Sequence, residues 1–175
     1  MLLRYAGLAL FAWLSCSVGF AADETSLFNG QDLTGWQTKA GESLEKQPTA
    51  FGGRFKVADG NLVIDDKVKG DVVIETVAKL GAKSELRFEF LPNAKCNNDL
   101  YFRGVKFDIK PTDVKNLKLD DWNEFEILSG ENSLEFKCNG QSIKTVKTKL
   151  PTSSLGIRAE FGAIQYRKLR VQTVK

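Results

Sequence analysis

The 175-residue chain contains no histidine, only three cysteines and four prolines, and little excess charge, with 25 Lys and Arg against 22 Asp and Glu. Without an imidazole there is no Ser-His-Asp or Cys-His nucleophile pair, no His-ligated zinc site and no histidine pH switch. Acid–base chemistry must therefore use carboxylates, lysine, tyrosine or water. The net charge of +3 and the lack of a basic cluster with interleaved aromatics argue against nucleic acid as a partner.

The first residues have the pattern of a secretory signal. A basic start precedes an apolar run over residues 5–20, which ends in small residues that suit cleavage before Ala22. The run is near the lower limit for a membrane span, so a retained N-terminal anchor is the alternative. We expect a signal peptide at 1–21 and a single β-sandwich domain at 22–175. The protein is then exported, periplasmic or extracellular, with no membrane contact after cleavage.

Export changes how the cysteines are interpreted. Cys16 would leave with the signal, and Cys96 and Cys138 would remain as a pair in a compartment where disulfides persist. They form a disulfide if their Cα atoms come within about 4.4–6.8 Å of each other. Otherwise they are two buried thiols, and the sequence leaves both alternatives open.

Apolar and charged residues alternate with a period of two along most of the remaining chain. In residues 86–90, for example, three apolar side chains alternate with two charged ones, as in a half-buried antiparallel strand. Further strands are predicted at 61–65, 72–77, 100–110, 124–127, 134–138, 142–146, 155–161 and 164–173. Turn pairs such as Asn139-Gly140 separate them, and no stretch has a convincing helical stripe. The sequence therefore predicts an all-β fold, a two-sheet antiparallel jelly-roll sandwich.

The alternation also assigns side chains to faces. In the last strand its parity changes at Arg167-Lys168, which predicts a bulge or a shift from one sheet to the other. Two groups of side chains are expected to point away from the core. They are Tyr101, Arg103, Lys106, Asp108 and Lys110 in one segment, and Arg158 and Glu160 in another. Ile157, Ala159 and Phe161 are expected to point inward.

Several segments carry motifs of one known domain family. Residues 27–36, LFNGQDLTGW, and residues 98–104, NDLYFRG, are similar to an LFNGKDLTGW opening and an NSGIYFRG strand. These motifs resemble those of the 3-keto-disaccharide hydrolase domain family, a concanavalin A-like jelly roll. Residues 122–127, WNEFEI, and 155–169, LGIRAEFGAIQYRKL, are similar to later family strands. The resemblance covers nearly all of the chain after the signal, and the opening decapeptide is its most specific element.

Two features differ from the usual family pattern. Only residues 105–121 connect the two strands between which relatives carry a longer stretch that helps to wall the cleft. Many relatives also have a histidine near a closing L-Q-x-H-G, where the nearest residues here are Glu160 and Phe161. These departures keep a second hypothesis open, a non-catalytic carbohydrate-binding β-sandwich.

The resemblance implies an enzyme that cleaves 3-keto-disaccharides or related oxidised glycosides on a concave sheet face. A ketone at C3 acidifies the C2 hydrogen, so a base can take that proton while a cation or donor holds the enolate oxygen. On this interpretation Glu160 is the base, Arg103 or Arg158 is the electrostatic partner, and Asp108 is a second carboxylate. A divalent metal cation held by these oxygens is a further option.

Substrate-binding candidates are Arg158, Tyr101 and Asn98, the last two from the more specific NDLYFRG motif. Arg158 with Glu160 is also interpretable as a solvated cross-strand charge pair, and Asp108 as a surface residue. If the enzyme hypothesis is right, Arg103, Asp108, Arg158 and Glu160 converge on one face within reach of a single sugar.

The remaining aromatic and acidic motifs favour structural roles. Trp36 and Trp122 could stack on a sugar, although core packing is the more usual use of so large an apolar surface. A retaining glucanase of this fold would carry two carboxylates on one strand face, commonly as Glu-x-Asp-x-Glu. Only Glu124-x-Glu126 comes near that pattern, which disfavours direct hydrolysis of an ordinary glycoside.

Overall fold

The structure is a computed structural model and describes residues 24–173. The expected signal peptide, residues 1–21, lies outside the described residues. Across residues 24–173 the chain forms β-strands and one short 3-10 turn, η1 (Phe51–Gly53). No helix in this part of the chain is long and apolar enough to cross a membrane.

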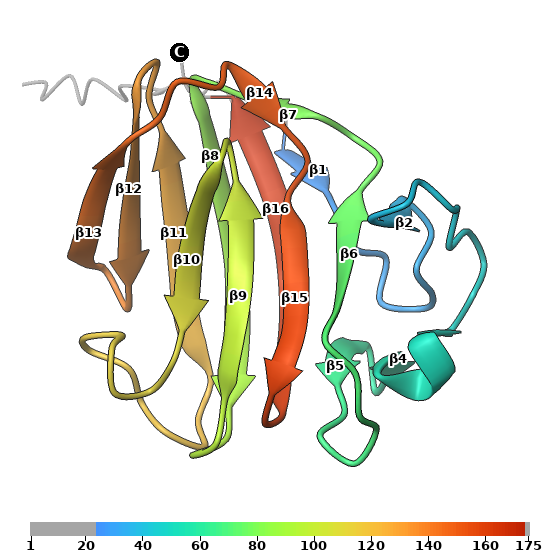
Figure 1. Cartoon of the computed structure of the whole chain (residues 1–175). Coiled ribbons are helices and arrows are strands. Elements are labelled where there is room, and N and C mark those ends of the chain that lie inside the picture. Colours follow the sequence, from blue (N-terminus) through green and yellow to red (C-terminus); the bar gives the residue numbers. More distant parts are fainter. Residues whose placement is uncertain (1–23, 174–175) are drawn as a thin grey trace, which may run out of the picture.

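The larger of the two main sheets forms the back layer in Figure 1. Its strands pair antiparallel throughout and lie in one continuous order, to which β1 (Glu24–Ser26) adds by pairing with the fifth member. That order is β13 (Gln141–Lys147), β12 (Ser133–Cys138), β11 (Asn123–Ser129), β8 (Ser84–Pro92), β16 (Ile164–Thr173), β5 (Asn61–Ile64), β4 (Phe55–Ala58) and β3 (Thr49–Ala50).

The smaller main sheet lies in front of it in Figure 1. Its antiparallel order is β10 (Val105–Ile109), β9 (Asn97–Phe102), β15 (Gly156–Phe161), β6 (Val72–Thr76) and β2 (Trp36–Thr38). A two-stranded sheet of β14 (Thr152–Ser153) and β7 (Leu80–Gly81) lies at one end. The predicted antiparallel sandwich is confirmed.

Alternating burial shows how the front sheet is oriented. Ile74, Leu100 and Ile157 are at most 1% exposed and face the back sheet. Their neighbours along the strands face away from the core, and Val73, Glu75, Tyr101 and Arg158 among them are only partly buried. We call this outer surface of β10, β9, β15, β6 and β2 the open face.

Aromatic side chains join the two layers. Phe107 of the front sheet stacks on Phe136 of the back sheet, with ring centroids 4.5 Å apart, and meets Phe125 edge-on at 5.2 Å. Such offset and edge-on pairs add to the free energy gained from burial. Trp36 is also fully buried, and its indole N–H donates to the Leu27 carbonyl at 2.9 Å, so the expectation of core packing is confirmed.

Two predicted strands differ in detail from the structure. The segment 100–110 is a hairpin, because Arg103 and Gly104 both have positive φ, 46° and 76°, and form the two-residue turn between β9 and β10. The predicted irregularity of the last strand is a bulge, with a register shift between Arg167 and Arg170. β16 stays paired with β8 on both sides of it, so the chain does not change sheets there.

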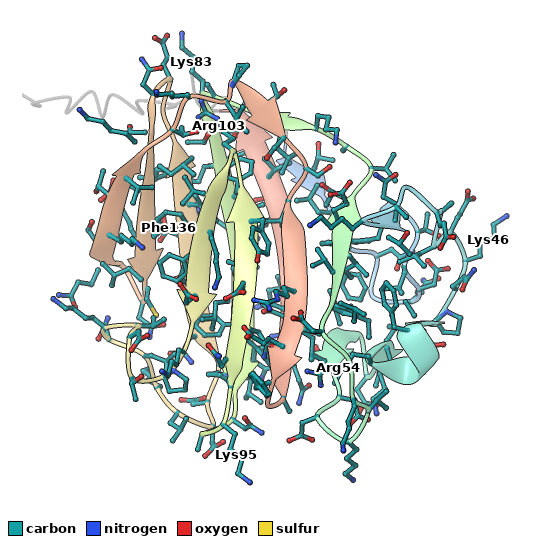
Figure 2. The ribbon with its side chains drawn as sticks, viewed as in Figure 1. Lys46, Arg54, Lys83, Lys95, Arg103 and Phe136 are labelled. Atoms are coloured by element: carbon teal, nitrogen blue, oxygen red, sulfur yellow. The ribbon has the colours of Figure 1, made fainter. Side chains whose placement is uncertain are left out.

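The turn explains why Arg103 does not point to solvent, as the alternation had predicted. Its side chain is buried, with the residue only 1% exposed, and its guanidinium donates to the Leu150 carbonyl at 2.7 Å and to the Ser129 hydroxyl at 2.8 Å. It also donates to the carbonyls of Gly130 and Glu131. Figure 2 shows Arg103 at the end of the sandwich where β9 turns into β10. Arg103 therefore ties three chain segments together.

The prediction that Phe161 points inward is also wrong. Phe161 is 62% exposed, because the register between β15 and β9 shifts between Arg158 and Phe161. Ile157 and Ala159, which precede this shift or lie within it, are fully buried as expected.

Cys96 and Cys138 are two free, buried thiols, which is one of the two alternatives that the sequence left open. The Cys96 thiol donates to the Ile109 carbonyl at 3.3 Å and accepts from the Asn98 amide at 3.3 Å. Burial raises the pKa of both thiols to about 11. Little thiolate is present at neutral pH, so neither cysteine is a reactive nucleophile.

We expect both thiols to resist a disulfide exchange reagent in the native protein at pH 8, since they are buried and protonated. Chain lacking residues 1–21 and unfolded in guanidinium without reductant should then release two equivalents of chromophore, one for each free cysteine. No release after unfolding would mean that the exported protein carries the disulfide.

We expect Arg103→Lys to lower the free energy of unfolding by about 3 kcal/mol, because lysine cannot reach all of the buried acceptors that the guanidinium satisfies. Urea unfolding measures this change. Arg170→Lys is the matched control, since Arg170 is partly exposed and pairs with Glu24 at 3.2 Å. It should cost less than about 1 kcal/mol. Equal effects of the two variants would remove the structural role assigned to Arg103.

Candidate functional site

Two adjoining pockets lie on the open face and share Lys39, Val73 and Tyr101 in their walls. The first, with a volume of about 260 Å³, also includes Glu75 and Lys79. The second, with a volume of about 620 Å³, is completed by side chains that include Phe51, Asp71 and Arg158. We call the two pockets together the sheet groove, and each of them a lobe.

Tyr101 lies at the junction of the two lobes because of a glycine on the next strand. Gly156 of β15 is the cross-strand partner of Tyr101 on one side and of Glu75 on the other. A Cβ atom at Gly156 would lie 3.3 Å from the Tyr101 Cβ, closer than side chains usually pack. The glycine therefore leaves room for the tyrosine ring and keeps the groove open between Tyr101 and Glu75.

Glu75 and Lys79 give the first lobe its polar groups. The Glu75 carboxylate accepts one hydrogen bond, from the Gln37 amide at 2.9 Å, and forms no ion pair with any residue of the described chain. The Lys79 ammonium donates to the Ser154 hydroxyl at 2.9 Å. The carboxyl group of Glu75, the amine of Lys79 and the phenol of Tyr101 therefore line one small pocket.

Phe51 forms part of the wall of the second lobe. It is 38% exposed and has a φ of 53°, a left-handed conformation that is strained for a bulky side chain. Its ring lies 6.3 Å from that of Phe55, which is fully buried. Strained residues of this kind gather at functional sites, and Phe51 presents an aromatic ring to the groove.

Ion pairs link the second lobe to the strands beside it in a charge cluster. The Nε and Nη2 atoms of Arg158 each lie 2.6 Å from an oxygen of Asp71. Its Nη1 donates to Asp99 at 2.7 Å and to Glu160 at 3.0 Å. The Lys106 ammonium lies 2.8 Å from Asp108 and 3.3 Å from Asp99. The charge cluster consists of Asp71, Asp99, Lys106, Asp108, Arg158 and Glu160.

These contacts favour the ionised forms of two acids of the charge cluster, Asp71 and Asp108. The hydrogen bonds from Arg158 lower the pKa of Asp71, and the hydrogen bond from Lys106 lowers the pKa of Asp108. Asp71 and Asp108 in turn raise the pKa of Arg158 and of Lys106. Asp99 is fully buried beneath them, and its Oδ1 has no hydrogen-bond partner. The charge cluster is therefore a fixed array of opposite charges.

A divalent metal does not fit these residues. Asp99, Asp108 and Glu160 each have an oxygen within 3.3 Å of a lysine or arginine nitrogen, and that positive charge opposes a bound cation. Across residues 24–173 no group of three or more His, Cys, Asp or Glu side chains has an arrangement that would hold a metal ion.

The structure brings together four of the six side chains expected at the site. Tyr101 and Arg158 line the sheet groove, and Asp108 and Glu160 belong to the charge cluster. Arg103 does not join them, because it is buried at the β9–β10 turn.

Asn98 and Trp122 also lie outside the groove. Asn98 is fully buried, and its side-chain oxygen accepts from the Glu160 N–H at 2.8 Å. Trp122 is partly exposed, and the Cζ atom of Arg167 lies over its indole ring, 3.8 Å from the ring centroid. Neither residue is placed to contact a ligand in the groove, but Asn98 positions a member of the charge cluster.

Sequence reasoning missed Glu75, Lys79, Asp99 and Phe51. The alternation in the predicted strand 72–77 places Glu75 opposite the buried side chains, and that signal could have identified it. The others carry no comparable signal, because their importance comes from pairing with distant strands and from backbone conformation.

We expect the pairing of Asp71 with Arg158 to stabilise the fold in a pH-dependent way. A folded-state pKa below the unfolded value, about 3.9, gives stabilisation that is complete above that value and is lost as the pH falls through the folded-state pKa. The difference in melting temperature between the wild type and Asp71→Asn should therefore be largest near neutral pH and shrink on acidification. A difference that stays constant on acidification would contradict this assignment.

The sequence pattern of the 3-keto-alpha-glucoside-1,2-lyase-like domain matches residues 23–116. The later similar segments, 122–127 and 155–169, lie outside that match. No curated protein matches the chain.

Solved structures share the fold at low sequence identity. A candidate glycosyl hydrolase from Parabacteroides distasonis ATCC 8503 superposes with a TM-score of 0.68 and 14% identity, over 87% of this chain and 94% of that chain. The carbohydrate-binding module CBM66 from Bacillus subtilis superposes with a TM-score of 0.56 and 8% identity, over 80% of this chain and 96% of that chain. A beta-1,3-glucanase from Mycobacterium marinum superposes with a TM-score of 0.51 and 13% identity, over 89% of this chain and 99% of that chain.

These similarities confirm the jelly-roll fold, and the sequence match covers more than half of the chain. The protein therefore belongs to the carbohydrate-active family of 3-keto-alpha-glucoside-1,2-lyase-like domains.

Proposed function

We propose that the protein binds a 3-keto-glycoside in the sheet groove and cleaves its glycosidic bond by elimination. The observation that carries this proposal is the Glu75 carboxyl group, which lines the first lobe and has no cationic partner among the described residues. Lys79 and Tyr101 line the same lobe and can supply hydrogen bonds to a developing negative charge. Membership of the family supports the class of sugar.

The reaction begins at the carbon next to the ketone. Glu75 takes the proton from C2, and the electron pair of that C–H bond becomes an enolate over C2, C3 and the C3 oxygen. Lys79 and Tyr101 hold the enolate oxygen. The enolate then reforms the ketone and a C1–C2 double bond while the bond from C1 to the leaving oxygen breaks. The leaving oxygen takes up a proton from Glu75 or from water, so protons and electrons balance.

The proposal moves the base from Glu160 to Glu75 for a physical reason. Glu160 accepts a hydrogen bond from Arg158, and Arg158 is itself held by Asp71 and Asp99. The Glu160 carboxylate is therefore already engaged by a guanidinium, whereas the Glu75 carboxylate accepts a single hydrogen bond from an amide and lines the first lobe. The charge cluster instead borders the second lobe, where it offers fixed donors and acceptors to sugar hydroxyls.

Non-catalytic carbohydrate binding is the second candidate function. The observation that favours it is that each carboxylate of the charge cluster is already paired with a basic side chain. The groove, with Tyr101 and Phe51 in its walls, offers a sugar both aromatic and polar surfaces whether or not a reaction follows. This candidate predicts saturable binding without release of product.

We expect the chain without residues 1–21 to release glucose from trehalose that carries a ketone at C3 of one glucose unit. Glu75→Gln should lower kcat by about 100-fold or more, because glutamine fills the same space and cannot take a proton. Glu135→Gln, on the back sheet, is the matched control and should leave the rate unchanged. Product release is followed by chromatography.

Three results would decide against this assignment. Equal rates for the wild type and Glu75→Gln would exclude Glu75 as the base. Loss of activity in Glu160→Gln alone would return that role to Glu160. Binding of the oxidised trehalose without any release of glucose would exclude the lyase and support the carbohydrate-binding candidate.

A further inference from the structure

The last residues of β15 contain a bulge that changes which face their side chains occupy. Arg158 is the cross-strand partner of Asp99, and Phe161 is the partner of Asn97. Two residues of β15 therefore lie opposite one residue of β9, Asn98, as in a β-bulge. The extra residue reverses the alternation that Ile157 and Ala159 follow into the core.

Side chains and a close backbone approach hold this bulge. The Asn98 amide accepts from the Glu160 N–H at 2.8 Å and donates to the Phe161 carbonyl at 3.0 Å. Arg54 donates to the Glu160 carbonyl at 3.0 Å. At Gly162, where φ is 69°, a Cβ atom would lie 2.4 Å from the Lys95 carbonyl oxygen. Figure 2 shows Arg54 and Lys95 at the end of the sandwich where β15 turns into β16.

The bulge places Phe161 on the open face. Directly paired residues of neighbouring strands point to the same side of a sheet, so Phe161 shares the side of Asn97. Asn97 shares that side with Asp99 and Tyr101, because residues two apart on a strand do so. A phenyl ring that strict alternation would have buried is instead 62% exposed, beside the charge cluster.

Phe161 also lies in line with the sheet groove. Its partner Asn97 is four residues along β9 from Tyr101, a distance of about 13 Å. Asp99 lies between Asn97 and Tyr101 along β9, and it pairs with Arg158 on β15. An exposed phenylalanine is common on protein surfaces and alone indicates little. Here, however, a bulge held by hydrogen bonds turns the ring outward, on the same face as the sheet groove and the charge cluster. That placement indicates a binding surface.

We propose that Phe161 is a stacking platform for a pyranose ring, at a subsite beyond the sheet groove. The ligand is then an oligosaccharide longer than a disaccharide. The apolar C–H face of the sugar would lie on the phenyl ring, and its hydroxyls would meet the adjacent side chains of Glu160 and Asn97. Only the choice of a sugar as ligand rests on the proposed function; the subsite does not depend on catalysis.

Binding of maltose and maltotetraose, measured by calorimetry, tests the subsite. The wild type should bind the tetrasaccharide more tightly than the disaccharide. Phe161→Ala should weaken tetrasaccharide binding about tenfold, and leave disaccharide binding within about twofold. Phe161→Tyr should retain the wild-type preference. Leu119→Ala, another exposed apolar side chain at 47% exposure, is the matched control and should change neither affinity.

A second measurement reports on the position itself. The fluorescence of Phe161→Trp, compared with that of the unsubstituted protein, should change with maltotetraose and not with maltose. Three outcomes would each overturn the proposal. The wild type could bind the two sugars equally tightly, it could show no detectable binding of the tetrasaccharide, or Phe161→Ala could weaken the binding of both sugars equally. Length-dependent binding in a protein that does not cleave oxidised trehalose would preserve the subsite and exclude the lyase.

Discussion

The open face depends on how one buried carboxylate is neutralised. Asp99 is fully buried in the middle of a β-sheet, where an isolated charge would be prohibitively costly. Arg158 on the next strand supplies the opposite charge at 2.7 Å, and the same guanidinium then binds Asp71 and Glu160. These acids are engaged with Arg158, whereas Glu75 in the first lobe has no ion pair among the described residues. The ion pairs of Arg158 thus fix the charged surface beside the groove, and under the proposed function they leave the role of base to Glu75.

Much of the fold could be predicted from local pattern. The alternation of apolar and charged residues identified the main strands, since a half-buried strand has a period of two. It also located the irregularity at Arg167-Lys168, where the change in parity lies within one strand, although it left a bulge and a shift between sheets as alternatives. The opening segment 27–36 identified the family, and it lies within the matched residues.

The site was harder to predict because its geometry arises between segments far apart in the chain. Arg103 was expected to face solvent because residues 100–110 were interpreted as one strand, whereas an Arg-Gly pair forms a hairpin turn there. The bulge that exposes Phe161 depends on Asn98, which is 63 residues away. Alternation along one strand shows neither a turn within it nor a register shift against another strand, so the orientations of Arg103 and Phe161 were both predicted wrongly.

The absence of histidine affects one particular position on the open face. Near the position where many relatives carry an imidazole, this chain has Glu160 held by Arg158 and Phe161 turned outward. The exchange removes a group that titrates near neutral pH and adds an apolar surface. Under the two proposals, this position holds a sugar ring and proton transfer falls to Glu75 in the neighbouring lobe. Binding and proton transfer would then lie at separate places on one sheet, so substitutions at Phe161 and Glu75 should affect different measurable steps.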